Sequence, residues 1–436
     1  MADALVTFAS RSDDAPNVAI AAREYELAER QMVLGKFASV YQLEQRMGTT
    51  LRVTRTKRLN LPTAPLTEGV APDSSAFTLE KVDVTVEQWG IVVAMTDVSM
   101  LTLTHPVLAK AITLVGMAIA EVGEREIAKI LMGGTNVTYG GTAASRDLLV
   151  ATDVATSRKL LTMTVAMRTA GGMPTQGNTY GGVMPPQMEG DLLDADSTFK
   201  DAQSRQNIAG LEYGDLGVWM GISWKRGNFL PSFKGVATPT TAAVTAEKAQ
   251  FTDQATGGGF NTDEIVKLVV VARDAQSDYE RKISQTATIT IGGVGATARS
   301  VDVKTASSTA YTYDIYASAV TNGAAKLWRS RVAASTTVTL TDFSDVSASA
   351  AAPPVAPGLN VETYVAWVFA KDAYMRVELN GMSLRSYRTP EGPSHSDPLA
   401  QVRKIGSKYM WKCAILDDAF LRRLEFGSSF PSGLPA

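Results

Sequence analysis

The stretch THPVLAKAITLVGMAIAEVGEREIAKILM, residues 104–132, carries the strongest structural signal in the chain. Its apolar residues recur every three or four positions, which is the spacing of one buried face of an α-helix. Pro106 falls in the first turn, where proline is well tolerated, and Gly133-Gly134 end the pattern. At 1.5 Å per residue the stretch predicts one helix roughly 40 Å long.

Upstream of this helix, residues 48–84 predict a long two-stranded loop with a basic outgoing arm and an acidic returning arm. Its charged residues include Arg52, Arg55, Lys57, Arg58, Glu68 and Asp73. The loop has few apolar side chains of its own, so we expect a neighbour to order it. The charges allow two interpretations: contacts between subunits, or ion pairs within an ordinary surface hairpin.

The remaining segments before residue 236 alternate between helical and extended patterns. Residues 84–97 predict a strand pair or one long bent strand. Helix formers predict short helices over 21–34, 153–171 and 187–203.

Residues 236–358 differ in composition from the rest of the chain. They contain none of the 16 Met, neither His and not the single Cys, and Ala, Thr, Ser and Val dominate. Short strands recur about every ten residues, which favours a small antiparallel sandwich. The predicted strands are 265–272, 286–291, 300–304, 310–317, 326–332 and 337–340. The flanking linkers favour an inserted domain, although a domain in series would give the same pattern. Strand patterning resumes over 361–379 and 408–426.

Composition and motifs argue against most enzyme classes. The chain has 436 residues, 45% of them hydrophobic, and a net charge of −2, which argues against a surface built to hold nucleic acid. One cysteine, Cys413, and two histidines nearly exclude His/Cys zinc sites and disfavour a His-based triad. We expect Cys413 to be a buried structural thiol. The sequence contains no P-loop, nucleophile elbow or zinc-protease motif, and we expect no catalytic, cofactor or metal site.

Neither a signal peptide nor a membrane helix is predicted. The N-terminal residues have no basic flank, and the longest apolar run, 111–120, is about half of what a bilayer requires. We therefore expect a soluble chain that is made inside the cell.

Three segments in combination resemble a known family. They are PTAPLTEGV (62–70), VEQWGIVVAMTD (86–97) and SDPLAQVRKIGSKYMWKCAILDDAFLRRLE (396–425). Together with the basic loop and the long helix, they are similar to the major capsid proteins of tailed double-stranded DNA phages, of the N4-like podovirus group. The resemblance covers roughly 20–235 and 359–426.

The resemblance implies an α+β protein with the Hong Kong 97-like fold. On this basis residues 1–47 are an N-terminal arm and 48–84 an extended loop. Residues 85–172 and 395–436 form a peripheral domain with a spine helix at 104–132, and 173–235 with 359–394 form an axial domain. Residues 236–358 depart from the family pattern and are expected to be an immunoglobulin-like or fibronectin III-like insertion.

The resemblance also implies a structural protein that assembles with itself into hexamers and pentamers of an icosahedral phage head. Such a head encloses double-stranded DNA without sequence-specific binding and is assembled in the host bacterial cytoplasm. Scaffolding, portal and cement proteins are further candidate partners, and no membrane is implied.

Two other functions stay open from the sequence. One is the shell of a cellular nanocompartment with the same fold. The other is a surface binding module that acts through the 236–358 sandwich, with Tyr316 and Trp328 as exposed binding candidates. Packing of both aromatic side chains in the sandwich core is the alternative to that role.

Overall fold

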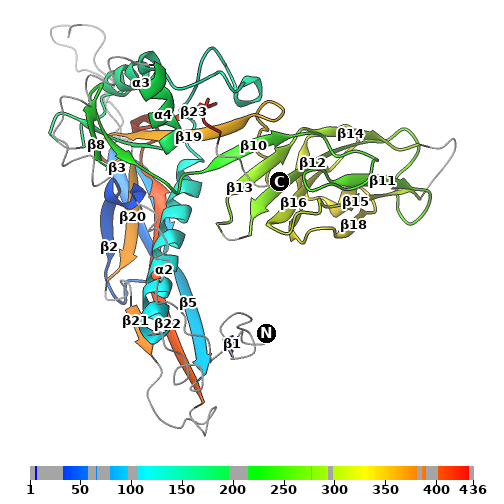
Figure 1. The fold of residues 1–436 in the computed structure, drawn as a ribbon, viewed down its shortest axis with the longest axis horizontal. Coiled ribbons are helices and arrows are strands. Elements are labelled where there is room, and N and C mark those ends of the chain that lie inside the picture. The colour runs from blue at the N-terminus through cyan, green and yellow to red at the C-terminus, as the bar shows by residue number, and fades with distance from the viewer. Residues whose placement is uncertain are drawn as a thin grey trace, which may run out of the picture. The chain divides into compact units, whose positions relative to one another are not determined.

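The computed structural model describes residues 5–6, 33–56, 65, 79–96, 107–175, 177–195, 215–275, 277–292, 298–380, 385–388 and 401–431 (Figure 1). The chain forms two compact units. Unit 1 contains Ala38–Gly123 and Asp372–Asp417, together with a short N-terminal strand. Unit 2 contains Glu124–Lys371, the residues after Asp417, and 33–37.

Unit 1 is built on a mixed sheet with the described order β1-β5-β22-β20-β2, and β21 pairs with β22. Its strands are β1 (Leu5–Val6), β2 (Ser39–Leu43), β5 (Glu87–Thr96), β20 (Tyr374–Leu379), β21 (Arg385–Arg388) and β22 (Val402–Ile415). The two longest strands, β5 and β22, are antiparallel and pair without a register shift from Thr96↔Val402 to Glu87↔Trp411. Of the two alternatives predicted for residues 84–97, a strand pair or one long strand, the structure therefore confirms the long strand.

A separate two-stranded hairpin in unit 1 consists of β3 (Thr50–Thr56) and β4 (Leu79–Thr85). This confirms that the two arms of the predicted loop pair with each other. Apolar residues of the hairpin join a core cluster with β2 and β20, which includes Leu43, Val84, Met375 and Val377. The neighbour that orders the base of the loop is thus part of the same chain, which the sequence did not reveal.

The predicted long helix is confirmed as α2, Val107–Leu131. The boundary between the two units falls inside it, after Gly123. Buried side chains follow the expected spacing at Ala111, Val115, Ile119, Ile127 and Leu131. The helix therefore contributes to the core of each unit in turn.

The main sheet of unit 2 has the described order β17-β16-β12-β13-β10-β19-β7-β9-β8, with β14 joined to β12 and β23 lying between β19 and β6. The strands outside residues 237–358 are β6 (Val137–Tyr139), β7 (Tyr180–Met184), β8 (Asp215–Trp219), β9 (Ile222–Arg226), β10 (Ser232–Val236), β19 (Glu362–Phe369) and β23 (Leu421–Phe426).

Helices α3 (Ser157–Thr169) and α4 (Pro186–Ala195) pack on this sheet through a core that includes Met163, Met188, Trp224, Val368 and Phe426. Both helices match predicted ones, and the described part of the second ends earlier than expected. Short 3-10 turns are η2 (Leu34–Lys36), η3 (Arg146–Leu148), η5 (Phe343–Asp345) and η6 (Asp418–Phe420).

Between β10 and β19 the chain forms strands around a core of its own (green to yellow in Figure 1). They are β11 (Gln250–Gln254), β12 (Ile265–Asp274), β13 (Glu280–Ser284), β14 (Ala287–Thr290), β15 (Ser300–Lys304), β16 (Tyr311–Ser318), β17 (Ala325–Val332) and β18 (Thr337–Leu340). Every strand predicted in 236–358 is confirmed, and β11 and β13 are additional. The second sheet has the order β11-β15-β18, so two sheets enclose this core.

Strand pairing joins the 236–358 segment to the rest of unit 2. Strand β13 pairs in parallel with β10, and β10 pairs with β19. One sheet of the segment is therefore continuous with the main sheet. Gly235 lies at this junction, where a side chain would collide with the carbonyls of Pro357 and Gly358.

Cys413 is buried on β22, as predicted, and burial raises the pKa of its thiol to about 12. Almost all of the helix predicted over 21–34 lies outside the described residues. His105 and His395 also lie outside them.

Candidate functional site

The β3–β4 hairpin is the first candidate site, because it holds the charged residues that the sequence singled out. Side chains along both strands alternate between exposed and partly or fully buried positions. Leu51, Val53, Val82 and Val84 lie on the inner face, against the core of unit 1. The opposite face is open to solvent and mostly polar, with Leu79 as an exposed apolar residue.

Arg52 and Asp83 occupy directly opposite positions on this outer face. The guanidinium donates two parallel hydrogen bonds, from Nε to Oδ1 at 2.6 Å and from Nη2 to Oδ2 at 2.7 Å. The hydrogen bond from Arg52 holds the pKa of the Asp83 carboxyl below its usual value. This pair fits the surface-hairpin interpretation of the charges.

Arg55 lies on the inner face and contacts two carboxylates. Its Nε donates to Oε2 of Glu80, directly opposite on β4, at 2.7 Å. Its Nη1 forms an ion pair with Asp417, which follows β22. Arg55 thereby ties the hairpin to the body of unit 1.

Of the other candidates in the loop, Lys57, Arg58, Glu68 and Asp73 lie outside the described residues. The described part therefore brings Arg52 and Arg55 together with carboxylates of the same chain. Contacts of these residues with another subunit remain a prediction.

Tyr316 and Trp328 are not exposed, which corrects the premise of the surface-binding interpretation. Their exposed fractions are 4% and 6%. Trp328 packs in the core between the two sheets, and burial raises the pKa of Tyr316 to about 12. Strand β16 is buried on nearly every residue, so alternation alone could not identify an exposed face.

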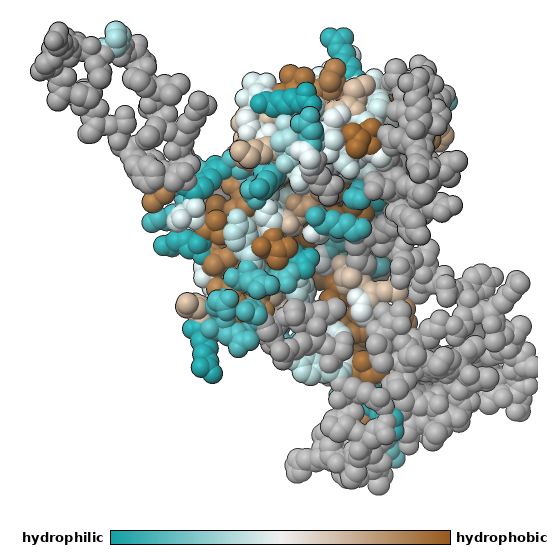
Figure 2. Space-filling model, turned by 90° about the vertical axis from the view of Figure 1, so that its left-hand side faces the viewer, coloured by the Kyte–Doolittle hydropathy of each residue, from teal (hydrophilic) through white to brown (hydrophobic). Residues whose placement is uncertain are grey.

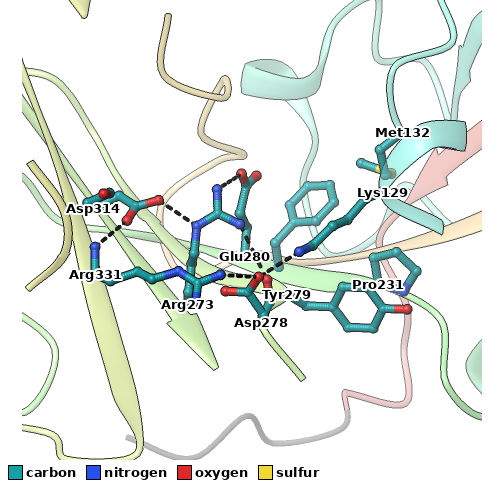
Figure 3. A pocket seen from close by; sticks show the side chains of 11 residues that line it. Lys129, Met132, Pro231, Arg273, Asp278, Tyr279, Glu280, Asp314 and Arg331 are labelled. Atoms are coloured by element: carbon teal, nitrogen blue, oxygen red, sulfur yellow. Dashed lines mark hydrogen bonds and ion pairs between the residues drawn. The ribbon is translucent and has the colours of Figure 1, made fainter. Parts of the chain in front are cut away.

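A second candidate site is a pocket of about 490 Å³ in unit 2, which the sequence did not indicate (Figure 3). One of its lining residues is Asp278, in the turn between β12 and β13. Oδ2 of Asp278 accepts a hydrogen bond from Nζ of Lys129 on α2 at 2.6 Å and another from Nη2 of Arg331 on β17 at 3.0 Å. Burial alone would raise the pKa of Asp278, but the hydrogen bond and positive charge of Lys129, with Arg331 and Arg273, lower it.

The pocket's other charged residues extend the same network. Arg273 donates to Oδ2 of Asp314 and, at 2.9 Å, to Oε1 of Glu280. Three cations therefore face three carboxylates, and their charges balance. This ion-pair network links β12, β13, β16 and β17 to the C-terminal end of α2. Its charged groups bond to one another rather than to a ligand.

A third feature is the buried carboxylate of Glu124, whose hydrogen bonds within the described ranges come from backbone N–H groups. Glu124 on α2 is 3% exposed and accepts hydrogen bonds from the backbone N–H of Val33 at 2.9 Å and of Leu34 at 2.9 and 3.1 Å. Burial raises the pKa of Glu124 despite these donors. The carboxylate therefore satisfies backbone donors at the N-terminal end of η2.

The described residues provide no group of three or more His, Cys, Asp or Glu that could hold a metal ion. Within the same ranges, no helix is both long and apolar enough to cross a membrane. On the face drawn in Figure 2, hydrophobic side chains lie in small groups among hydrophilic ones.

Comparisons with known proteins agree with one another. Residues 79–270 match a protein-family model described as phage capsid protein. Among solved structures, the capsid of cyanophage P-SCSP1u superposes with a TM-score of 0.51 and 13% identity over 94% of this chain and 93% of that one. The capsid of cyanophage Pam1 gives a TM-score of 0.51 and 11% identity over 99% and 100%. No curated protein sequence matches the chain.

The chain therefore has a mixed α+β fold that it shares with these phage capsid structures over 94–99% of its length. At these identities the superpositions establish the fold. Together with the family match they support a major capsid shell protein.

Proposed function

We propose that this chain is the major capsid protein of a tailed double-stranded DNA phage, with a structural and non-enzymatic role. The observation that carries the proposal is the match of residues 79–270 to the phage capsid family, within a fold that corresponds to two cyanophage capsids along nearly the whole chain. Copies of the chain assemble with one another into hexamers and pentamers of an icosahedral head.

The finer architecture that we propose is Hong Kong 97-like. Helix α2 is the spine helix, the β3–β4 hairpin is the base of the extended loop, and the sheet of β5 and β22 belongs to the peripheral domain. The two-sheet segment between β10 and β19 is an immunoglobulin-like or fibronectin III-like insertion. The three quoted sequence segments favour the N4-like podovirus group.

The proposed partners follow from this role. The head encloses double-stranded DNA without reading its sequence, and the net charge of −2 suits a lining that does not retain DNA during filling. Assembly takes place in the host bacterial cytoplasm, where scaffolding, portal and cement proteins are candidate partners.

The loop residues are proposed as contacts between subunits. Arg52 and Arg55 are paired within the chain, so the cations available to a neighbour are expected among Lys57 and Arg58. Glu68 and Asp73 are the corresponding acidic candidates. Each exposed ion pair is worth only about 0–1 kcal/mol, so repetition over many copies carries the effect.

The test is negative-stain electron microscopy of the purified full-length chain, concentrated with a crowding agent. Closed shells, tubes or six-membered rings are expected. If only small particles form under these conditions, and also on co-expression with the scaffolding protein of the source phage, the proposal is wrong.

A further inference from the structure

The solvent-exposed face of helix α3 carries an inference that goes beyond the proposed function. The other side of the helix faces the main sheet of unit 2 and consists of Leu160, Met163, Thr164 and Met167. On the exposed side, Leu161 is 47% exposed and Val165 is 53% exposed. These two residues are four positions apart, so they are neighbours on one face of the helix.

Two cations flank this apolar pair. Arg158 lies one turn before Leu161, Arg168 lies one turn after Val165, and both arginines are exposed. At 1.5 Å per residue the two arginines are about 15 Å apart along the helix axis. The helix contains no Asp or Glu. Its exposed face therefore presents a cation, two apolar side chains and a second cation in a row.

Neither ion pairing nor helix stability explains these cations. Within the described ranges Arg158 and Arg168 form no ion pair, whereas Arg146 and Arg226 of the same unit each bind a carboxylate. Arg158 and Lys159 also lie in the first turn of α3, where the helix dipole disfavours cations. Unpaired cations on one exposed face favour a negatively charged partner.

The same character continues past the end of the helix. Met173 is 68% exposed, and its carbonyl accepts a hydrogen bond from the backbone N–H of Lys371 at 2.8 Å. Lys371 is itself exposed, and no ion pair of its side chain is found in the part of the chain that the structure describes. A further cation and a further apolar residue therefore lie beyond the C-terminal end of α3.

The apolar pair favours a protein partner over DNA. A phosphate backbone has no apolar groups that would cover Leu161 and Val165. The hydroxyl groups of the face are also engaged, because Thr162 donates to the carbonyl of Arg158 at 2.8 Å and Thr169 to that of Val165 at 2.9 Å. A phosphate oxygen only accepts hydrogen bonds, and these hydroxyls have no second hydrogen to donate. An acidic amphipathic helix would cover the apolar pair and supply carboxylates to both arginines.

The other long helices of this chain do not offer such a face. Glu124 and Glu126 on α2 already accept hydrogen bonds within the chain, as do Glu189 and Asp191 on α4. Helices α2 and α4 of a second copy are therefore poor occupants, and a different protein fits better.

We propose that the exposed face of α3, from Arg158 to Arg168, binds an acidic amphipathic helix of a protein other than this chain. Leu161 and Val165 contact the apolar residues of the partner, and the two arginines bind its carboxylates. The inference names the chemistry of a partner and does not depend on the shell function.

The experiment measures binding of three probes to the purified full-length chain by fluorescence anisotropy. The first probe is a synthetic helical peptide in which leucines four positions apart are flanked by glutamates. The second is a scrambled peptide of the same composition, and the third is duplex DNA. We expect the first peptide to bind roughly tenfold more tightly than the scrambled peptide. Binding is measured whether or not the chain assembles, so failure of the shell function leaves this test valid.

The double variant Arg158→Glu/Arg168→Glu tests the charges. Its matched control is Lys248→Glu/Lys326→Glu, which reverses two cations of the 236–358 segment that also form no ion pair within the described ranges. We expect the arginine variant to bind the peptide roughly tenfold less tightly and the lysine variant to bind it as the unaltered protein does. Thermal denaturation checks that each variant is folded.

The double variant Leu161→Gln/Val165→Gln tests the apolar contact, and it should also bind the peptide roughly tenfold less tightly. Unaltered protein that does not bind the peptide, or that binds the scrambled peptide equally well, overturns the proposal. A folded arginine variant with unchanged peptide binding overturns it too. Tighter binding of DNA than of the peptide, lost in the arginine variant and kept in Leu161→Gln/Val165→Gln, would assign the face to nucleic acid instead.

Discussion

Arg55 and Asp417 join two parts of unit 1 that lie far apart in the sequence. The guanidinium on β3 forms an ion pair with the carboxylate that follows β22, and the same arginine holds Glu80 on the opposite strand of the hairpin. The base of the proposed extended loop is therefore fixed to the sheet of its own subunit.

The first prediction concerns Arg55→Glu. The new carboxylate would face Glu80 and Asp417, so the attachment of the hairpin to the body of unit 1 should weaken. Because Arg55 is 41% exposed, solvent screening limits the loss to about 1 kcal/mol in the free energy of unfolding. We expect the variant to be soluble and to assemble poorly, as measured by denaturation and electron microscopy.

Arg52→Glu is the matched control, because its pair with Asp83 lies on the exposed outer face. This variant should lose the cross-strand pair and keep the link to Asp417. If the two variants assemble equally well, the anchoring role of Arg55 is wrong.

The second prediction concerns the pH dependence of the network around Asp278. The pKa of this carboxyl is lower in the folded protein than in the unfolded chain. Its ion pairs therefore stabilise the fold above the ordinary aspartate pKa of about 4, and this contribution is lost as the pH falls through the lowered folded value.

Asp278→Asn should lower the free energy of unfolding at pH 7 by about 2 kcal/mol, because Lys129 loses the nearer of its two carboxylate partners in a partly buried site. The variant should also lose stability less steeply than the unaltered protein below pH 4. Urea denaturation at a series of pH values measures both effects. Parallel curves for the two proteins would show that Asp278 is not the titrating group.

Glu124 is expected to behave in the opposite sense. Its pKa is raised by burial, so the folded protein binds this proton more tightly than the unfolded chain does. The contribution of Glu124 to stability should therefore decline as the pH rises from the ordinary glutamate value of about 4.3 through the raised folded value.

The third prediction follows from the donors that Glu124 satisfies. Glu124→Ala leaves buried N–H groups of Val33 and Leu34 without their acceptor, which should cost about 2 kcal/mol. Hydrogen exchange of these two amides should accelerate. Glu124→Gln retains one acceptor oxygen, so it should lose less protection and remove the pH dependence. Unchanged exchange in the alanine variant would refute this capping role.

Local patterns in the sequence predicted α2, the β3–β4 pairing and the strands of residues 236–358. Each depends on a short-range period or on turn residues. The parallel pairing of β10 with β13 and the ion pair between Lys129 and Asp278 join distant segments, and no local signal indicates them. For Tyr316 and Trp328 the sequence left both exposure and core packing open, and the structure buries both side chains. Nearly every residue of β16 is buried, so alternation could not identify an exposed face at Tyr316.

The fourth prediction tests the corrected position of Trp328. Because this side chain packs between the two sheets of the 236–358 segment, Trp328→Ala should lower the free energy of unfolding by about 3–5 kcal/mol. The exposed Val320→Ala in the same segment should change stability by less than about 0.5 kcal/mol. Thermal denaturation measures the stability of both variants. Equal stability of the two would contradict the buried position of Trp328.

The last prediction contrasts two glycines whose backbones differ. Gly141 has φ +48°, and a Cβ there would collide with the carboxylate of Asp153, so Gly141→Ala should cost about 3 kcal/mol or more. Gly116 lies inside α2 with open space around the position of its missing Cβ. Gly116→Ala should therefore stabilise the helix by up to about 1 kcal/mol. Thermal denaturation of both variants measures the contrast. If assembly fails in Gly116→Ala while its melting temperature rises, the space beside Gly116 is needed by a neighbouring subunit rather than by the fold.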